Sequence, residues 1–191
     1  MSWRLALYDS EEASKAKIIT LNLLVIITIL CGYGYWTDFV PSPEWAEIGF
    51  NLSVAATILS VSTYYFALAT GYAKFQPKTS TPIKLLTITT LPFLALFVFV
   101  VAITHGFGDI ATQALGHEAE LTVELSKEQQ QSRKGCNYRL KGYAIGNALP
   151  SRICVSKAEF GILPQTGEYI LQVKQTLLGF HVKNIATAVN R

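Results

Sequence analysis

The pattern of apolar and polar positions changes near residue 106. Before it, three long stretches, at 18–36, 48–72 and 85–104, contain no charged residue. A helix needs about 20 apolar residues to cross a bilayer core of roughly 30 Å, and each stretch meets that length. A buried helix in a soluble protein of this size would be shorter and would carry a polar stripe. The pattern therefore predicts three transmembrane helices, over about 18–36, 47–73 and 84–105.

From residue 117 onward, apolar positions alternate with polar ones, which is the period of half-buried strands. The runs lie around 121–125, 138–141, 151–156, 169–173 and 178–182. Ser156 and Glu159 have the spacing of a helical capping box, which predicts one short helix after the third run. The expected fold is membrane α+β: three transmembrane helices, then a small antiparallel β domain of about five strands and one short helix. The expected units are an N-terminal segment at 1–17, a membrane region at 18–105, a linker at 106–116 and the β domain at 117–191.

The distribution of Lys and Arg predicts the orientation, because short basic loops stay on the cytoplasmic side. The loop at 37–47 contains no basic residue, whereas the N-terminal segment and the second loop contain Arg4, Lys15, Lys17, Lys74, Lys78 and Lys84. We therefore expect a cytoplasmic N-terminus and an extracytoplasmic β domain. Apolar anchoring of the first stretch is expected to be permanent, since no small-x-small cleavage pattern follows it.

Aromatic side chains are concentrated near the first loop, at Tyr33, Tyr35, Trp36, Phe39 and Trp45. Amphipathic rings prefer the headgroup level, so these residues are expected at the membrane interface. His105, at the end of the third stretch, is expected there too. Before that stretch, Ser80 and Pro82 predict the helix start, and inside it Pro92 should interrupt the backbone hydrogen bonding of the helix.

Two of the three cysteines, Cys136 and Cys154, fall in the exported domain, where a disulfide can persist. Closing a loop of this size would contribute about 3 kcal/mol in the chain-entropy model. The simplest register that joins them places Ile153 beside Arg139. An apolar and a charged side chain would then share one face of the sheet. Either a bulge or a position of Cys136 just outside its strand would avoid this.

Small residues recur along the second stretch, at Gly49, Ser53, Thr57 and Ser60. The spacing of the first three lets helix backbones approach closely. This face is expected either to pack against the other two spans or to dock the helix of a partner.

The segment 133–152 contains five basic residues and no acidic one: Arg133, Lys134, Arg139, Lys141 and Arg152. They form either a solvated strand face or a basic edge that contacts anionic lipid headgroups or an acidic partner.

The sequence carries no motif for catalysis. It has no Gly-rich phosphate loop, no nucleophile elbow and no close pair of metal-ligand residues, with His117 and His181 standing alone. The stretches 18–36, 48–72 and 85–104 contain no charged residue, which argues against a lone transporter. We therefore expect no enzyme activity, no cofactor, no metal and no nucleic-acid partner.

These observations favour a multi-pass protein of a bacterial inner membrane with its β domain in the periplasm. The expected function is binding, as an accessory or assembly subunit of a membrane complex. Its expected partners are membrane lipid and either another integral membrane protein or a second copy of the chain. Two alternatives stay open: an immunity protein that neutralises a toxin at the periplasmic face, and a lipid or ligand sensor.

Overall fold

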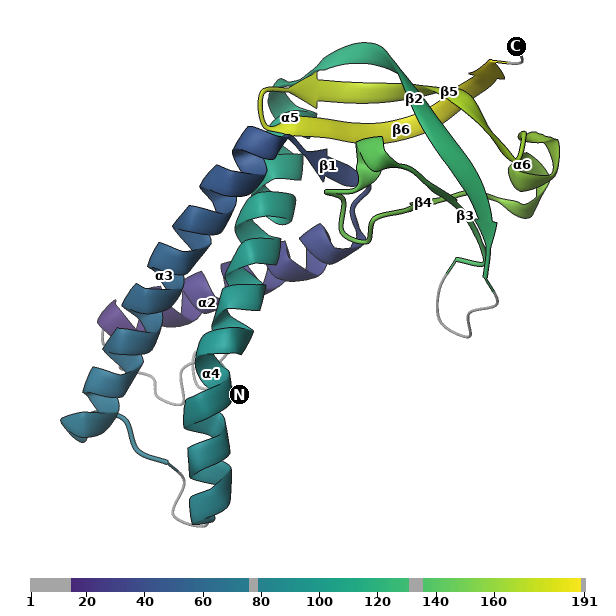
Figure 1. The fold of residues 1–191 in the computed structure, drawn as a ribbon. Helices are drawn as coiled ribbons and strands as arrows, with labels where there is room; N and C mark the ends of the chain where they lie inside the picture. Colours follow the sequence, from purple (N-terminus) through teal and green to yellow (C-terminus); the bar gives the residue numbers. More distant parts are fainter. Residues whose placement is uncertain (1–14, 76–78, 131–135, 190–191) are drawn as a thin grey trace, which may run out of the picture.

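The computed structural model describes residues 15–75, 79–130 and 136–189. Within them, three helical segments are long and apolar enough to cross a membrane, at Lys17–Trp36, Pro43–Ala69 and Thr81–Leu115. A curled antiparallel sheet of six strands lies across one end of these helices (Figure 1). The three expected helices and the β domain are thus present, and the sheet has one strand more than expected.

The third helix is longer than the sequence suggests. The first two helices are α2 (Lys15–Trp36) and α3 (Pro43–Ala69), and the third consists of α4 (Thr81–Val100), the π-helical η1 (Val101–Phe107) and α5 (Gly108–Leu115). At 1.5 Å per residue, the 35 residues of the third helix extend about 50 Å, well beyond a bilayer core. The segment 106–116, expected as a linker, is therefore helical through Leu115. Most of the expected segment 1–17 lies outside the described residues.

Helices α3 and α4 are joined where a proline interrupts the backbone. Pro92 lies inside α4, as predicted, and has no N–H to donate to the carbonyl of Ile88. The Tyr65 hydroxyl of α3 donates to that carbonyl oxygen at 2.5 Å. Because Pro92 cannot donate to this carbonyl, the neighbouring helix supplies the hydrogen bond instead. Prolines inside helices are tolerated in apolar surroundings when another group supplies the missing hydrogen bond in this way.

Helix α2 meets η1 at a pair of glycines. A Cβ atom on Gly34 would lie 2.5 Å from the backbone nitrogen of Gly106, and one on Gly106 would collide with the carbonyl oxygen of Leu30. Only residues without a side chain fit here, so the two backbones touch. By contrast, a Cβ on Gly32 would meet nothing within 4 Å.

The sheet has the strand order β1-β6-β5-β2-β3-β4, and every pair is antiparallel. Its strands are β1 (Phe39–Pro41), β2 (His117–Gln129), β3 (Tyr138–Lys141), β4 (Ile153–Cys154), β5 (Thr166–Thr176) and β6 (Gly179–Val189). The additional strand, β1, comes from the loop between α2 and α3 and pairs with β6, with Phe39 opposite His181. Three residues are too few to show a period of two, so the sequence gives no sign of this strand.

The core of the β domain lies on the inner face of the curled sheet. The alternation predicted for β2 and β5 holds, with Leu121 opposite Leu171 and Val123 opposite Tyr169. Tyr169 and Leu171 are fully buried, and Leu125 is 1% exposed. Two register shifts between β5 and β6 increase the local twist, which favours the curl.

The short helix is α6 (Lys157–Ile162), and the predicted capping box is confirmed. The Glu159 backbone N–H donates to the Ser156 hydroxyl at 3.2 Å, and the Ser156 N–H donates to the Glu159 carboxylate at 2.8 Å. A 3₁₀ turn, η2 (Tyr143–Ile145), fills the connection between β3 and β4.

The predicted disulfide between Cys136 and Cys154 is present, with the two Cα atoms 5.7 Å apart. Cys136 lies just outside β3, so the second of the two proposed resolutions is correct. The register pairs Leu140 with Ile153 and places Arg139 opposite Cys154. The apolar side chains therefore stay together on the inner face.

Candidate functional site

The most unusual polar group in the described chain is Asp109, whose side chain is completely buried. It is the second residue of α5 and lies two residues after the end of the π-helical segment. Its carboxylate accepts hydrogen bonds from Tyr33, from Thr37 at 2.5 Å and from Gln113 at 2.7 Å, and its second oxygen lies 2.7 Å from Nδ1 of His181. We call these five residues the Asp109 cluster.

The Asp109 cluster connects three parts of the fold. Tyr33 and Thr37 lie at the end of α2, Asp109 and Gln113 are one turn apart on α5, and His181 belongs to β6. Gln113 also donates to the Tyr33 hydroxyl at 2.8 Å. A buried carboxylate is costly unless its oxygens are hydrogen-bonded, and here both are. The cluster therefore holds the helices and the sheet in one arrangement.

Further polar contacts extend this junction along α5. The hydroxyls of Thr112 and Thr176 lie 2.8 Å apart, and Lys174 donates to the Gln113 carbonyl at 2.5 Å. Gly116 packs against the backbone of Gln175. The end of the third helix is thus fixed to β5 as well as to β6.

The π-helical segment positions a second set of contacts below the Asp109 cluster. Trp45 donates its indole N–H to the Thr104 carbonyl at 3.0 Å. Phe39 and Trp45 close around Gly108, where a Cβ would lie 2.7 Å from the indole nitrogen. Phe39 is fully buried and Trp45 is 9% exposed, so both rings pack inside the junction and expose little surface to lipid headgroups.

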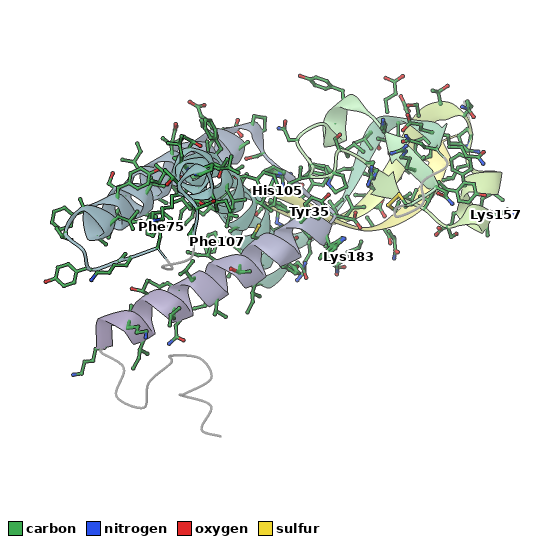
Figure 2. All side chains as sticks on the ribbon, turned by 90° about the horizontal axis from the view of Figure 1, so that it is seen from below. Tyr35, Phe75, His105, Phe107, Lys157 and Lys183 are labelled. Carbon is green, nitrogen blue, oxygen red and sulfur yellow. A yellow bond between two sulfur atoms is a disulfide. The ribbon has the colours of Figure 1, made fainter. Side chains whose placement is uncertain are left out.

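His105 is also buried within the protein, with 7% of its surface exposed. Figure 2 places Tyr35, His105 and Phe107 around the junction of helices and sheet. Within the described chain, His105 Nδ1 and Thr104 Oγ1 have no hydrogen-bond partner. Tyr35 and Trp36 differ from the two buried rings, since they remain 48% and 81% exposed.

The small-residue face of α3 is turned into the chain itself. Gly49, Ser53 and Thr57 are buried, and a Cβ on Gly49 would lie 2.5 Å from the Thr104 hydroxyl. Ser53 donates to the Gly49 carbonyl at 2.6 Å and Thr57 to the Ser53 carbonyl at 2.7 Å, so both hydroxyls are used within α3. Ser60 is exposed and lies apart from this contact.

The basic residues predicted as a group are only partly available. Arg139 is 5% exposed, and its Nε lies 2.8 Å from the carboxylate of Glu128, as does the Lys141 ammonium. The Lys141 hydrogen bond and the Arg139 charge hold the pKa of Glu128 below its usual range. Arg152 lies near the same carboxylate, whereas Arg133 and Lys134 lie outside the described residues.

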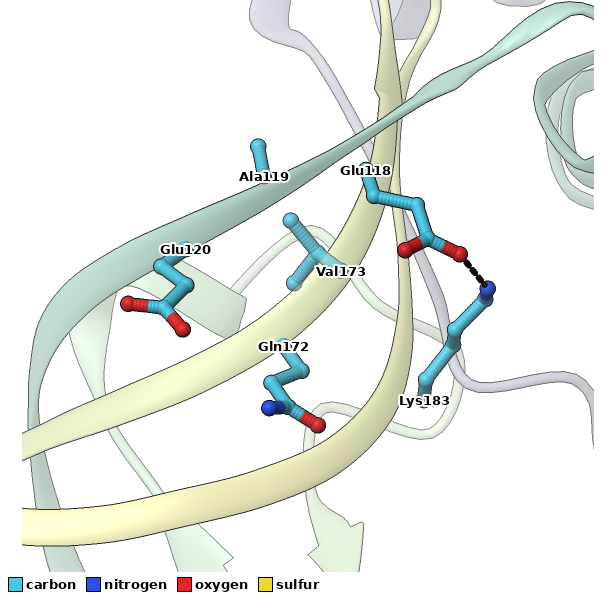
Figure 3. Close-up of a pocket in the computed structure, with 6 residues that line it drawn as sticks. All are labelled: Glu118, Ala119, Glu120, Gln172, Val173 and Lys183. Atoms are coloured by element: carbon cyan, nitrogen blue, oxygen red, sulfur yellow. Dashed lines mark hydrogen bonds and ion pairs between the residues drawn. The ribbon is translucent and has the colours of Figure 1, made fainter.

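A pocket of about 430 Å³ lies on strands β2, β5 and β6. It is lined by Glu118, Ala119, Glu120, Gln172, Val173 and Lys183 (Figure 3). Glu118 and Lys183 form an ion pair at 2.7 Å across it, and the Lys183 ammonium lowers the pKa of Glu118. In residues 15–75, 79–130 and 136–189, no three His, Cys, Asp or Glu side chains are grouped as metal ligands would be.

Sequence reasoning missed the Asp109 cluster. Asp109 is 76 positions from Tyr33 and 72 from His181, and no short spacing links the three elements that contribute to the cluster. One signal was available: Asp109 is the one acidic residue between Glu47 and Glu118, close to the end of an apolar stretch. Comparison with known protein families, curated proteins and solved structures finds no match for this chain.

Proposed function

We propose that this protein is a non-enzymatic integral membrane protein that acts by binding, as an accessory or assembly subunit of a membrane complex. One observation carries the proposal: the Asp109 cluster joins the β domain to the helices through buried, hydrogen-bonded contacts. A domain on a flexible tether samples many positions. A domain fixed in this way presents one surface at a constant height and orientation, which suits a partner held in the same membrane.

The helices offer the other part of the binding surface. Apolar side chains such as Ile29, Leu59 and Phe93 are 64%, 71% and 75% exposed. Lipid is the natural solvent for such surfaces, and a partner helix can replace it. Because the small-residue face of α3 is already used inside the chain, the partner contact is proposed for these outward faces, with another integral membrane protein or a second copy of the chain as the partner.

The proposed location is a bacterial inner membrane, with the N-terminus in the cytoplasm and the β domain in the periplasm. The basic residues of the second loop support this orientation through the positive-inside rule. The disulfide between Cys136 and Cys154 supports it independently, since such bonds persist in oxidising compartments.

Fusions after Arg191 test the orientation. An alkaline phosphatase fusion should be active and a green fluorescent protein fusion dark, because the first folds only outside the cytoplasm and the second only inside. An inactive phosphatase fusion with a fluorescent green fluorescent protein fusion would reject the proposed orientation but would not contradict the fold.

Purification from native membranes in mild detergent tests the binding function. The protein should elute with a second component at constant stoichiometry, or as a defined oligomer. The Asp109→Ala variant should lose that association while remaining in the membrane, and Gly32→Ala, which changes a position with open space around it, should retain it. A protein that elutes alone as a monomer in every mild detergent would count against the proposal.

A further inference from the structure

The β5–β6 hairpin ends in an unusual turn. Its two central residues are Leu177 and Leu178, whereas tight turns usually carry Gly, Asn, Asp or Ser. Leu177 is 94% exposed. No charged residue occurs from 175 to 180, so the whole tip is uncharged. A large apolar side chain at such a tip has no benefit in water.

The tip cannot fold back to hide this side chain. Ser42 donates its N–H to the Leu178 carbonyl and its hydroxyl to the Leu177 carbonyl, both at 2.9 Å. Gly179, with φ at +144°, lies so close to β1 that a Cβ would be 2.8 Å from the Cα of Pro41. The turn is therefore fixed against the start of α3 and against the edge strand.

The position of Ser42 defines the level of the tip. Ser42 is the N-cap of α3, a helix long and apolar enough to cross a membrane. Glu44 and Glu47 lie in its first turns, and the charge-free stretch begins immediately after them. The tip thus lies where α3 would leave the hydrocarbon core, at the same end of the helices as the exposed ring of Trp36.

We infer that Leu177 inserts into the headgroup layer of the bilayer and that the β5–β6 hairpin is a membrane-contacting element of the β domain. The occupant is lipid, because the uncharged tip is held at the N-cap of a helix that is long and apolar enough to cross a membrane. The inference depends on the proposed function in one respect, namely that the three helices lie in a membrane. It adds that the β domain itself touches that membrane.

Site-directed spin labelling of the full chain in vesicles of phosphatidylethanolamine and phosphatidylglycerol tests this contact. Single cysteines replace Leu177, Phe93 in the middle of α4, and Ile162 on α6, in a Cys31→Ala background that keeps the disulfide. Phe93 and Ile162 are 75% and 84% exposed, and α6 lies at the end of the sheet far from the helices (Figure 1). The measured quantity is the ratio of the label's accessibility to oxygen and to a water-soluble nickel chelate.

The expected order of this ratio is Phe93 highest, Leu177 intermediate and Ile162 lowest, with the Leu177 value several-fold above that of Ile162. Equal ratios at Leu177 and Ile162, with a high ratio at Phe93, would overturn the inference and leave the membrane assignment intact. A low ratio at Phe93 would instead reject the membrane assignment itself. A Leu177→Asp variant gives a second readout, with the spin label on a cysteine at the neighbouring position Thr176. The label should be more accessible to the nickel chelate in this variant than in the parent chain. An unchanged accessibility would also contradict the inference.

Discussion

The Nδ1 atom of His181 lies 2.7 Å from the Oδ1 atom of Asp109, and this contact joins the last strand of the β domain to the third helix. The Asp109 side chain is completely buried, and that of His181 is 21% exposed. A protonated His181 forms an ion pair here, and a neutral one with its proton on Nδ1 still donates a hydrogen bond. The joint is therefore expected to depend on both side chains.

Replacing Asp109 with Ala should lower the free energy of unfolding by about 3 kcal/mol, because the hydroxyls and the imidazole around it lose their shared acceptor. The measurement is the midpoint of thermal unfolding in mild detergent. A double-mutant cycle with His181→Ala should show a coupling of at least about 1 kcal/mol between the two side chains. Additive effects would mean that the two residues act separately.

The glycine contact between α2 and η1 gives a matched pair of variants. Gly34→Ala should destabilise the protein by about 1–3 kcal/mol, since its Cβ would lie 2.5 Å from the backbone nitrogen of Gly106. Gly32→Ala, two residues earlier in the same helix, should be neutral or stabilising by up to about 1 kcal/mol, because nothing lies within 4 Å. Thermal unfolding of both variants checks the difference, and equal midpoints would argue against a close crossing.

The hydroxyl of Tyr65 compensates for the proline in α4. Tyr65→Phe removes its 2.5 Å hydrogen bond to the Ile88 carbonyl and should cost about 1 kcal/mol. In a Pro92→Ala background, where residue 92 can donate to Ile88 again, the same substitution should cost less. Tyr64→Phe is the control at the neighbouring position. If Tyr65→Phe behaves like Tyr64→Phe in both backgrounds, the compensation does not operate.

Acid should weaken the β domain in part through Glu128. Its pKa in the folded protein is held below the ordinary value of 4.5 by Lys141 and Arg139. A carboxyl group whose pKa is lower in the folded protein stabilises the fold at pH values above its pKa in the unfolded chain. This stabilisation is lost as the pH falls through its pKa in the folded protein. Midpoints of unfolding measured from pH 7 to pH 3 should therefore drop below about pH 4.5. Glu128→Gln should reduce that drop, and a parallel profile for the variant would assign the acid sensitivity to other groups.

Elements with a strong local signal were predictable from the sequence. The three apolar stretches, the alternation of Leu121, Val123 and Leu125 along β2, and the Ser156 capping box each depend on neighbouring residues. The disulfide was predictable because only two cysteines fall in the same segment. The helices, the alternation and the capping box are each determined by residues close together in the sequence. The disulfide has only one possible pairing within its segment.

The junction depends on contacts between residues far apart in the chain, and there the sequence was insufficient. Strand β1 pairs with β6, and Phe39 and Trp45 pack against Gly108, which lies far from them in the sequence. Asp109 resembles an ordinary polar residue of a connecting segment until the structure places His181 beside it. The segment 133–152 contains no acidic residue, but Glu128, which lies outside that range, forms ion pairs with Arg139 and Lys141 and neutralises part of its charge.

We predict above all that the β domain stays fixed to the helices and does not move on a flexible tether. A distance distribution between spin labels at Phe93 and Ile162, measured by double electron–electron resonance in lipid nanodiscs, tests it most directly. A single narrow peak is expected for the parent chain, and a broadened one for Asp109→Ala. A broad distribution in the parent chain itself would contradict the claim.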